Sequence, residues 1–462
     1  MCIDNSGRMV FGTSTSAFGT EPIRQRLYMM SEGSLGLLAS SGDLIANHPS
    51  FRYASFERPT INDDGTLAFV SETTTPAQTA VVTGQPGAFQ LTALRGPDPN
   101  PVPGYPSGLG LIARPAPLSN AGAVAFTEGG VSRSVWFGAP GALQRVFGDS
   151  DPIPGQSATA SSVAGAGVYG NTGVLIRGLV GSQSGAPRFA ALATPQGLTV
   201  LAGPGLPAPG TTGVFTAAGN PATCSSSAIA FSASYVEGGI PRSGVWLGTP
   251  GNFSLLARSG DAAPGMTGFS LTSFVTPTLT ESGRGFLRAS ASDGSTTSFG
   301  VWDIQEDELQ LAFRGGSQIE NLPTGNTLHS VNADGAIAVN EAGQMEFLGT
   351  VRTGPTTQQF GLLAYDPSLG LMSVARIGET FQVGPGDTRT ISAIHTLLPD
   401  VLGAGLGGDD GLGRYLTDDG RLVFTLDFAD QSSGIFSTII PAPSSAVAGC
   451  VWGLLAWRRT RK

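Results

Sequence analysis

Two ten-residue stretches of this chain are closely similar, INDDGTLAFV at 61–70 and LTDDGRLVFT at 416–425. Laying the pattern along the chain recovers eight copies, which start near residues 3, 61, 118, 169, 223, 279, 339 and 416. Six of the seven steps between successive copies are about 55 residues long, and the last step is longer. A period that persists over so many steps indicates a repeat architecture, and it constrains the fold more than any other feature.

The motif predicts a turn that leads into a strand. Asn, Asp and Ser side chains begin turns by bonding to nearby backbone, and Gly adopts the positive φ that other residues avoid. The residues after the glycine alternate towards a buried aromatic or aliphatic position. The positions predicted to form the turn and the strand core are Gly7, Asn62, Gly65, Phe69, Gly122, Phe126, Gly173, Gly283, Asn340, Gly343, Phe347, Gly420 and Phe424.

A second pattern follows the motif in each unit. SVWFGAPGALQRVFGDSDPIPG (134–155) and SGVWLGTPGNFSLLARSGDAAPG (243–265) each read as a strand, a tight turn and a second strand. With a further short apolar run, one unit holds about four strands, and no long helical periodicity is present. The sequence therefore predicts an all-β fold, a β-propeller of seven to eight four-stranded blades over residues 1–440. Tandem β-sandwiches with two repeats each are the alternative.

Charge and cysteine content argue against a nucleic-acid-binding protein and against a disulfide-rich one. The formal net charge is −9, and no basic stripe interrupts the body, which argues against nucleic acid as a partner. Cys2, Cys224 and Cys450 have no metal-type spacing, and three cysteines do not indicate a disulfide framework.

Residues 441–462, PAPSSAVAGCVWGLLAWRRTRK, form a separate segment. An apolar run from 446 to 457 follows the Pro-x-Pro sequence, and a basic cluster ends the chain. Twelve residues cover about 18 Å as a helix, less than the ~30 Å core of a bilayer, so we expect transient membrane contact rather than a stable span. The residues that define the segment are Pro441, Ala442, Pro443, Arg458, Arg459, Arg461 and Lys462.

This segment resembles the PEP-CTERM type of sorting signal, with Ala in the middle place of the first triplet. The resemblance implies export across the inner membrane and removal of the tail by an exosortase-like protease, which would change the net charge from −9 to −13. Together with the repeats, the chain resembles the "choice-of-anchor" bacterial surface proteins, which carry tandem Asn-x-x-Gly-x-x-Ala-Phe repeats. The Asn position departs from that pattern at Asp4, Ser119, Gly170, Cys224, Thr280 and Thr417.

The amino-terminal sequence MCIDNSGRMVF already lies within a repeat motif. An exported protein is expected to begin with a basic segment followed by an apolar one. The last unit, from 416 to 440, contributes only two strands after its motif. The hypothesis that follows is a start codon farther upstream, which would add a signal peptide and complete a blade.

Residues for catalysis are sparse. His48, His329 and His395 lie in different repeats without a ligand-spaced partner in sequence, and the Gly-x-Ser-x-Gly elbow of serine hydrolases is missing. Calcium is a weak candidate ligand for the acidic pairs Asp409-Asp410 and Asp418-Asp419. The Gly-Asp turns at 42–43, 148–149 and 260–261 are predicted to be structural, and Trp136, Trp246 and Trp302 are predicted to pack in the core rather than to stack on sugars.

The sequence thus predicts a non-catalytic binding or extracellular-matrix component without a cofactor. It would be exported to the cell surface or medium and would bind polysaccharide or other surface proteins. A propeller hydrolase or lyase that acts on extracellular glycans is the alternative.

Overall fold

The computed structural model describes residues 1–14, 24–46, 48–74, 77–95, 111–112, 117–129, 132–224, 226–305, 308–332, 337–396, 414–440 and 455–457. Every regular element in these ranges is a β-strand. The strands belong to two compact units, one of residues 1–257 with 408–414 and one of residues 258–407 with 415–462.

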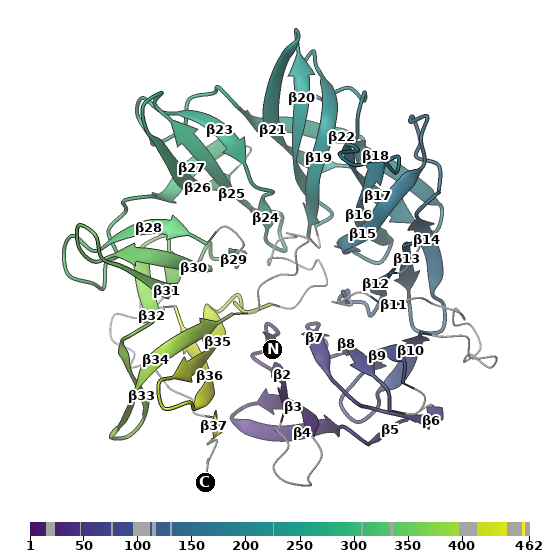
Figure 1. The fold of residues 1–462 in the computed structure, drawn as a ribbon, viewed down its shortest axis with the longest axis vertical. Helices are drawn as coiled ribbons and strands as arrows, with labels where there is room; N and C mark the ends of the chain where they lie inside the picture. The colour runs from purple at the N-terminus through teal and green to yellow at the C-terminus, as the bar shows by residue number, and fades with distance from the viewer. Residues whose placement is uncertain are drawn as a thin grey trace. The chain divides into compact units, whose positions relative to one another are not determined.

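The first unit holds five antiparallel sheets of four strands, which follow one another in chain order (Figure 1). We call these sheets blades 1 to 5, and β22 ends one residue beyond the unit. Their strands are β1 (Cys2–Ile3), β2 (Met9–Ser14), β3 (Gln25–Ser31) and β4 (Ser34–Ser40); β7 (Glu57–Ile61), β8 (Leu67–Glu72), β9 (Thr79–Gly84) and β10 (Gln90–Leu94); β11 (Leu111–Ile112), β12 (Val124–Gly129), β13 (Ser134–Gly138) and β14 (Gln144–Gly148); β15 (Ala160–Tyr169), β16 (Gly173–Val180), β17 (Arg188–Thr194) and β18 (Gly197–Ala202); and β19 (Val214–Thr223), β20 (Ile229–Glu237), β21 (Ile240–Thr249) and β22 (Asn252–Arg258). A ribbon of β5 (Leu44–Ile45) and β6 (His48–Arg52) links blades 1 and 2.

The second unit holds three sheets of five strands, blades 6 to 8. Their strands are β23 (Ser270–Phe274), β24 (Thr278–Leu279), β25 (Gly285–Ser292), β26 (Thr297–Gln305) and β27 (Glu308–Arg314); β28 (Thr327–Val331), β29 (Ala338–Val339), β30 (Met345–Arg352), β31 (Gln358–Asp366) and β32 (Gly370–Arg376); and β33 (Thr380–Gly384), β34 (Asp387–His395), β35 (Arg421–Phe428), β36 (Ser433–Ile439) and β37 (Leu455–Trp457).

These eight successive antiparallel sheets, five of four strands and three of five, form a β-propeller, for which the repeat predicts seven to eight blades of four strands. The alternative of tandem sandwiches is wrong, because each repeat forms one sheet of its own rather than half of a pair of packed sheets. The motif lies at the same place in each blade, at the turn between the inner and the second strand.

The turn explains the motif residues. In blade 2 the amide of Gly65 donates to the carbonyl of Asn62 at 2.9 Å, and Gly65 has a φ of 82°. This is a turn followed by a left-handed residue, a common way to close a three-residue hairpin. The Asn62 Oδ1 atom also accepts a hydrogen bond from the amide of Thr66 at 2.8 Å. The side chains of Asp4, Ser119, Asn340 and Thr417 accept the equivalent bond in their copies, so three of the departures from Asn keep the acceptor.

One copy departs from the predicted alignment. In blade 4 the turn is closed by the amide of Thr172 on the carbonyl of Tyr169, one residue earlier than the alignment on Gly173 predicts. Gly173 already begins β16, and Gly170 takes the positive φ of 51°. The apolar core position consequently falls on Ile176, which is fully buried, rather than on Arg177.

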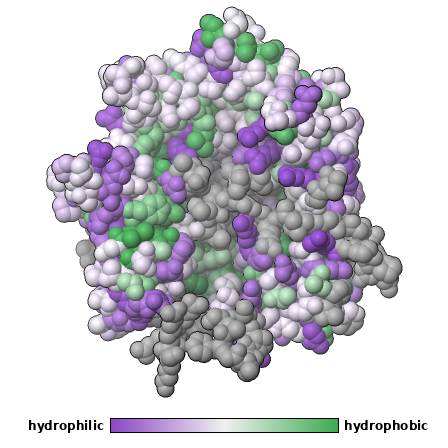
Figure 2. Space-filling model, in the orientation of Figure 1, coloured by the Kyte–Doolittle hydropathy of each residue, from purple (hydrophilic) through white to green (hydrophobic). Residues whose placement is uncertain are grey.

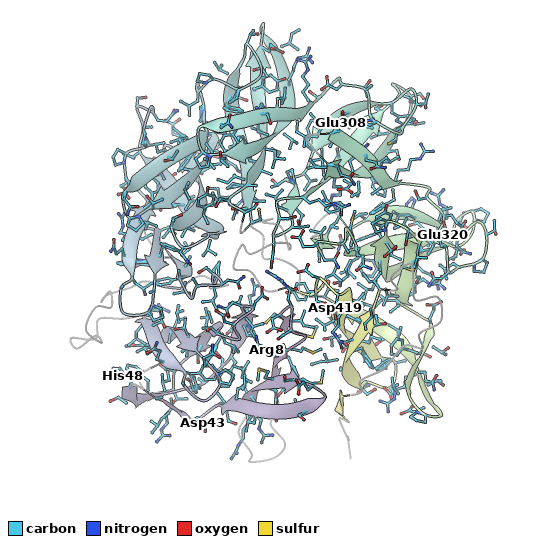
Figure 3. All side chains as sticks on the ribbon, turned by 180° about the vertical axis from the view of Figure 1, so that it is seen from behind. Arg8, Asp43, His48, Glu308, Glu320 and Asp419 are labelled. Atoms are coloured by element: carbon cyan, nitrogen blue, oxygen red, sulfur yellow. The ribbon has the colours of Figure 1, made fainter. Side chains whose placement is uncertain are left out.

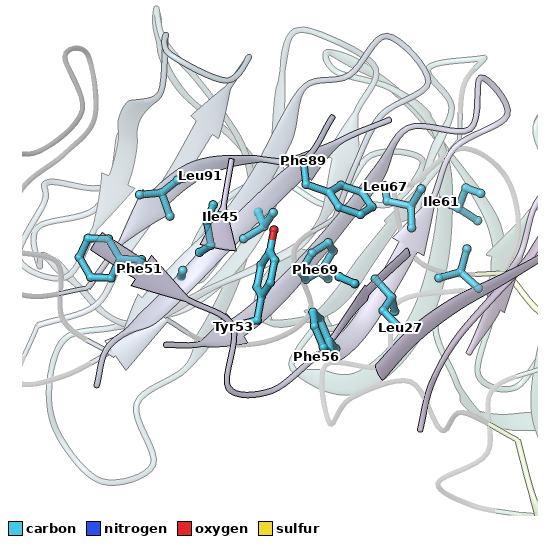
Figure 4. Packing of buried hydrophobic residues seen from close by; sticks show 14 of the residues in the cluster. Leu27, Ile45, Phe51, Tyr53, Phe56, Ile61, Leu67, Phe69, Phe89 and Leu91 are labelled. Atoms are coloured by element: carbon cyan, nitrogen blue, oxygen red, sulfur yellow. The ribbon is translucent and has the colours of Figure 1, made fainter. Parts of the chain in front are cut away.

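Alternation along the second strand builds the core between blades. Leu67 and Phe69 of β8 pack towards blade 1 with Leu27, Tyr53 and Phe56 (Figure 4). Ala68 and Val70 lie on the opposite face of the same strand and pack against Val124 and Phe126 of blade 3. The Ala-Phe pair of the motif therefore puts a large side chain on one blade interface and a small one on the other.

The tryptophans confirm the prediction of core packing. Trp246 and Trp302 are fully buried, and each indole Nε1 donates to a backbone carbonyl, of Pro209 and Pro264 respectively, at 2.9 Å. Trp136 is half-buried, stacks on Phe126 and donates to Glu128 at 3.0 Å. The rings of Trp246 and Trp302 are therefore not accessible for stacking on a sugar.

The carboxyl-terminal segment lies mostly outside the described residues. Pro441, Ala442, Pro443, Arg458, Arg459, Arg461 and Lys462 are among those not described, as are Asp409 and Asp410. Leu455–Trp457 form strand β37 rather than part of the expected short helix. Within the described ranges, no helix has the length and apolar character needed to cross a membrane.

Candidate functional site

The motif turns of the first unit are joined by hydrogen bonds into one continuous row, which we name the motif-turn row. It runs from blade 1 to blade 5 through turns 4–7, 62–65, 119–122, 169–172 and the turn that Ser227 closes on Cys224. Amides, carboxylates and hydroxyls make the links, and in blades 1 to 3 the residue at the second place of the turn, Asn5, Asp63 or Asn120, takes part in them.

The link between blades 2 and 3 shows the pattern fully. Asn62, which is buried, donates from Nδ2 to the carbonyl of Ser119 at 3.0 Å. The amide of Asp63 donates to Oδ1 of Asn120 at 3.1 Å, and Asn120 Nδ2 returns a bond to Asp63 at 3.3 Å. Each blade therefore positions the turn of the next one by bonds to its backbone as well as to its side chains.

Further links extend the row to both sides. The amide of Asn5 donates to Asp63 Oδ1 at 3.2 Å. The Ser119 hydroxyl donates to Asn171 at 2.8 Å, and the Tyr169 hydroxyl donates to the carbonyl of Ser227 at 3.2 Å. The row is therefore unbroken across all five blades.

Asp63 is the centre of a charged cluster in this row. Arg8 forms an ion pair with the buried Asp4 and donates from Nη2 to the carbonyl of Asp63 at 2.7 Å. Arg414 lies 3.7 Å from the Asp63 carboxylate. Figure 3 shows Arg8 at the inner end of blade 1, far from Asp43 and His48 at its outer side. Two guanidinium groups and two carboxylates thus meet at one place and balance each other.

The second unit repeats the arrangement with different residues. Asn340 donates from Nδ2 to the carbonyl of Thr417 at 2.9 Å, and the amide of Glu341 donates to Asp418 at 3.1 Å. The Glu341 carboxylate in turn accepts two bonds from Ser282 in blade 6. Blades 6, 7 and 8 are therefore linked through their motif turns as blades 1 to 5 are.

Arg284 corresponds to Arg8 in this unit. It donates to the carbonyl of Glu341 at 3.4 Å and forms a two-point ion pair with Asp303, with Nε 2.9 Å from Oδ1. The bonds to Asp303 raise the pKa of Arg284 despite its partial burial. The guanidinium also lies over the ring of Phe286. The pair is thus a fixed structural charge rather than a proton donor.

The motif analysis missed Arg8 and Arg284, which link motif turns of neighbouring blades in the first and the second unit. Both follow the motif glycine directly, in the strings NSGRM and ESGRG, and Arg421 does so in DDGRL. An arginine that recurs at one motif place was the signal that could have singled them out. The carbonyl that the arginine binds lies in the next repeat, so the sequence of one repeat does not identify it.

Glu346 stands where most motif copies have a small or apolar residue. It lies on β30 next to Phe347, is 3% exposed, and its Oε2 has no hydrogen-bond partner among the described residues. Burial raises the pKa of this carboxyl to about 8. Met345 and Phe347 pack towards blade 6, so Glu346 is on the other face of the strand.

The acidic pair Asp418-Asp419 is used within the fold. Asp418 accepts the bond from blade 7, and Asp419 accepts from the hydroxyl of Thr417 and, at 3.4 Å, from the amide of Arg421. Among the described residues, no three His, Cys, Asp or Glu side chains lie close enough to hold a metal. Calcium at this pair remains a prediction.

The Gly-Asp turns have the structural role that was expected. Asp43 and Asp261 each accept a bond from the backbone amide three residues earlier, at 2.7 and 3.1 Å. In blade 3 that bond goes to Asp151, whereas Asp149 accepts from the amides of Arg133 and Val163.

The histidines do not converge on one site. His48 contacts Phe51 by an edge-on ring contact in the first unit, and His329 lies by Arg352 in the second. His395 Nε2 lies 2.9 Å from Asp427, which also accepts from Ser433 at 2.6 Å. The serine therefore faces the carboxylate rather than the imidazole, and this exposed group lacks the order of a nucleophile and its base.

A groove of about 710 Å³ lies in the second unit. Its lining residues are Pro264, Gly265, Gln305, Glu308, Leu309, Gln310 and Leu311. Gln305 is held by a bond to Asp303 at 2.7 Å. The lining combines amide and carboxylate groups with leucine side chains.

Comparison with known proteins adds a family and a set of similar folds. A family model, described as a family of unknown function (DUF7453), matches residues 3–447. No curated protein matches the chain.

Three solved structures illustrate the similar folds. The β-propeller domain of the Trilobed protease from Pyrococcus furiosus is 10% identical, with a TM-score of 0.37, and the match covers 84% of this chain and 95% of that one. Dipeptidyl peptidase 4 of Porphyromonas gingivalis is 9% identical, with a TM-score of 0.48, over 90% of this chain and 56% of that one. The polysaccharide lyase Uly1 is 9% identical, with a TM-score of 0.40, over 86% and 93%. At these values the matches carry no argument about what the chain does.

Proposed function

The chain belongs to the DUF7453 family, whose description assigns no activity, and we propose that it is a non-catalytic binding component of the cell surface or extracellular matrix. In this proposal the propeller is a rigid support. The partly exposed side chains of the motif-turn row, such as Asn5, Asp63 and Asn120, contact the ligand.

The observation that carries the proposal is the pairing within the Asp63 cluster. Asp4 is bound by Arg8, and Asp63 accepts from Asn5 and Asn120 and lies by Arg414. A general base or nucleophile needs a group that can exchange its proton or attack a substrate, and paired charges held by several bonds are poorly suited to either role. The same amides and carboxylates can still share hydrogen bonds with the hydroxyl groups of a polysaccharide.

Export is the second part of the proposal. It is supported by the Pro-x-Pro sequence, the apolar run and the basic end of residues 441–462, which resemble a sorting signal. An exosortase-like protease would remove this tail after transient contact with the inner membrane. The mature protein would then carry a net charge of −13, which favours solubility and attraction of divalent cations.

The test is to recover the protein from its native host in membrane, surface and medium fractions and to measure its intact mass. We expect a form that ends near Pro443, in the surface or medium fraction. That form is then screened against immobilised polysaccharides with and without calcium, beside the variant N5A/N120A. Binding that is lost in the variant supports the motif-turn row as the ligand surface.

Two outcomes would overturn the proposal. A full-length form confined to the cytoplasm would remove the export part. Release of shortened glycan by the purified protein would replace binding with the enzyme alternative.

A further inference from the structure

Blade 8 obtains its outermost strand differently from the other blades. In each of the other seven, the outermost strand follows the third strand after a short turn. In blade 8 the corresponding strand is β36, the fourth of five, and it pairs with β37, which comes from the tail of the chain. The pairing is antiparallel, with Ser433 opposite Trp457, Gly434 opposite Ala456 and Ile435 opposite Leu455.

The register of β37 is the one that outermost strands have elsewhere in the chain. In blade 6, Gly300 and Val301 of the third strand lie opposite Arg314 and Phe313. Gly434 and Ile435 stand at the same places of β36, so Leu455 takes the register position of Phe313. The equivalent pairs in blades 1, 3 and 7 are Leu27–Ala39, Val135–Phe147 and Leu362–Ala375.

A blade without this strand would end in an open edge. Edge strands carry unpaired amides and carbonyls that accept any extended segment of suitable chemistry. Ile439, at the end of β36 away from its pairing with β37, is 50% exposed. The strand that pairs with this edge, Leu455–Trp457, has the sequence Leu-Ala-Trp.

We infer that the outer edge of β36 is a strand-docking site whose occupant is Leu455–Trp457 of the same chain. These residues also belong to the apolar run that the proposed export places at the inner membrane. One segment cannot pair with β36 and enter a bilayer at the same time, so docking and membrane contact exclude each other. The docking itself stands without the proposed function, and only its competition with the membrane rests on it.

Paired cysteines test the docking. In a C450S background, S433C/W457C puts two cysteines at directly opposite positions, within the 4.4–6.8 Å that a disulfide requires between Cα atoms. S437C/W457C is the matched control, since residue 437 lies on the same strand about 13 Å farther along. We expect the first pair to form an intramolecular disulfide at least tenfold faster than the second, as measured by mass spectrometry. Equal rates, or no disulfide in either, would overturn the docking.

The same variant tests the competition. Flotation with vesicles of phosphatidylethanolamine and phosphatidylglycerol in equal parts compares the oxidised and the reduced forms of S433C/W457C. We expect the reduced form to float and the oxidised form to stay unbound. Equal flotation of both forms would overturn the competition, and flotation of neither would contradict membrane contact, hence the proposed export, while leaving the docking intact.

A second measurement tests the docking without cysteine substitutions, in case these variants fail to fold. Hydrogen exchange of the peptide that covers β36 is compared between the full chain and a chain that ends at Pro443. We expect exchange in β36 to be about tenfold faster in the shorter chain and exchange in β26 to be unchanged. Identical rates in β36 would speak against the docking.

Discussion

The guanidinium group of Arg8 fills the space beside Gly65, two residues that belong to neighbouring blades. A Cβ atom at residue 65 would lie 2.8 Å from Arg8 Cζ. The same relationship joins Arg284 to Gly343, with the same distance to Cζ, and at Gly420 the neighbour is Gln344. The motif glycine is therefore required by the preceding blade as well as by its own turn.

Replacement of Gly65 by Ala should lower the free energy of unfolding by more than the strain of a positive φ alone would. A non-glycine residue with left-handed φ costs about 1–2 kcal/mol, and the displacement of Arg8 should add roughly as much again. Gly87→Ala is the matched control, since Gly87 has a φ of 81° and nothing within 4 Å. Urea unfolding should show the larger loss for G65A, and the difference should vanish in an R8A background. An equal loss for G65A and G87A would contradict the role of Arg8.

Glu346 should make the stability of the second unit depend on pH. Its pKa in the folded chain is raised to about 8 from the ordinary 4.5 by burial, so the folded state binds the proton more tightly. The stability that this carboxyl contributes is fully present below pH 4.5 and is lost as the pH rises to about 8, by an amount on the order of a few kcal/mol. Thermal unfolding from acid to alkaline pH should show this loss in the native chain and a flatter profile in E346Q. The exposed Glu308→Gln should leave the profile unchanged, and a slope that persists in E346Q would assign the effect elsewhere.

Asn62 should be far more sensitive than the neighbouring turn residue Asp64. Asn62→Ala removes the bond to the amide of Thr66 and the donor to Ser119, and leaves buried backbone groups unpaired. A loss of about 1–3 kcal/mol for each unpaired group is expected. Asn62→Asp keeps the acceptor for the amide of Thr66 but removes the donor to Ser119. A smaller loss of unfolding free energy in Asn62→Asp than in Asn62→Ala would assign the larger contribution to the bond with Thr66. Asp64→Ala, at an exposed position, should change the free energy of unfolding by less than about 0.5 kcal/mol.

The ion pair of Arg284 and Asp303 should contribute measurably to stability. Removal of one partner of a fully buried pair costs about 3–5 kcal/mol, and because 24% of the Arg284 side chain is exposed we expect roughly 2–3 kcal/mol for D303A. The pair of Arg389 and Asp387 is the control, since half of the Asp387 side chain is exposed. D387A should cost at most about 1 kcal/mol. Chemical unfolding of both variants at low and high salt checks the prediction, which fails if D387A costs as much as D303A.

The thiol of Cys2 should be inert in the folded protein. It is fully buried, and burial raises its pKa to about 12, so almost no thiolate is present near neutral pH. In a C450S background, a thiol reagent such as Ellman's should label neither Cys2 nor the equally buried Cys224 until denaturant is added. Fast labelling of the native C450S chain, lost again in C2S/C450S, would show that the first blade opens locally.

The sequence was sufficient for the fold because its signal is local and repeated. Turn chemistry at Asn62 and Gly65 and alternation at Leu67 and Phe69 are both written within ten residues, and both are confirmed. The period predicts seven to eight blades, and the structure has eight. In blade 4 the motif aligns on Gly173. Burial of Val174 and Ile176 fixes the register of the strand instead, so the turn closes one residue earlier than the alignment predicts.

The sequence alone does not predict which residues of one repeat contact those of another. The contact of Arg8 with Asp63 spans 55 residues, and the pairing of β36 with β37 joins the repeat domain to the tail. Glu346 reads as a polar residue that belongs at a surface, yet β30 is covered on both faces. The surface itself gives little guidance, since the face in Figure 2 intersperses hydrophilic and hydrophobic residues. These relations depend on packing between blades, which no single repeat encodes.

The motif-turn row has a consequence for how the first unit comes apart. Each turn from Asp4 to Ser227 receives bonds from its neighbour, so a blade that opens leaves unpaired polar groups in the blade beside it. Repeat proteins that touch only through apolar faces can fray from one end. Here the loss of one blade penalises the next, and a protease should convert the five blades to fragments in a single step, without a stable four-blade intermediate.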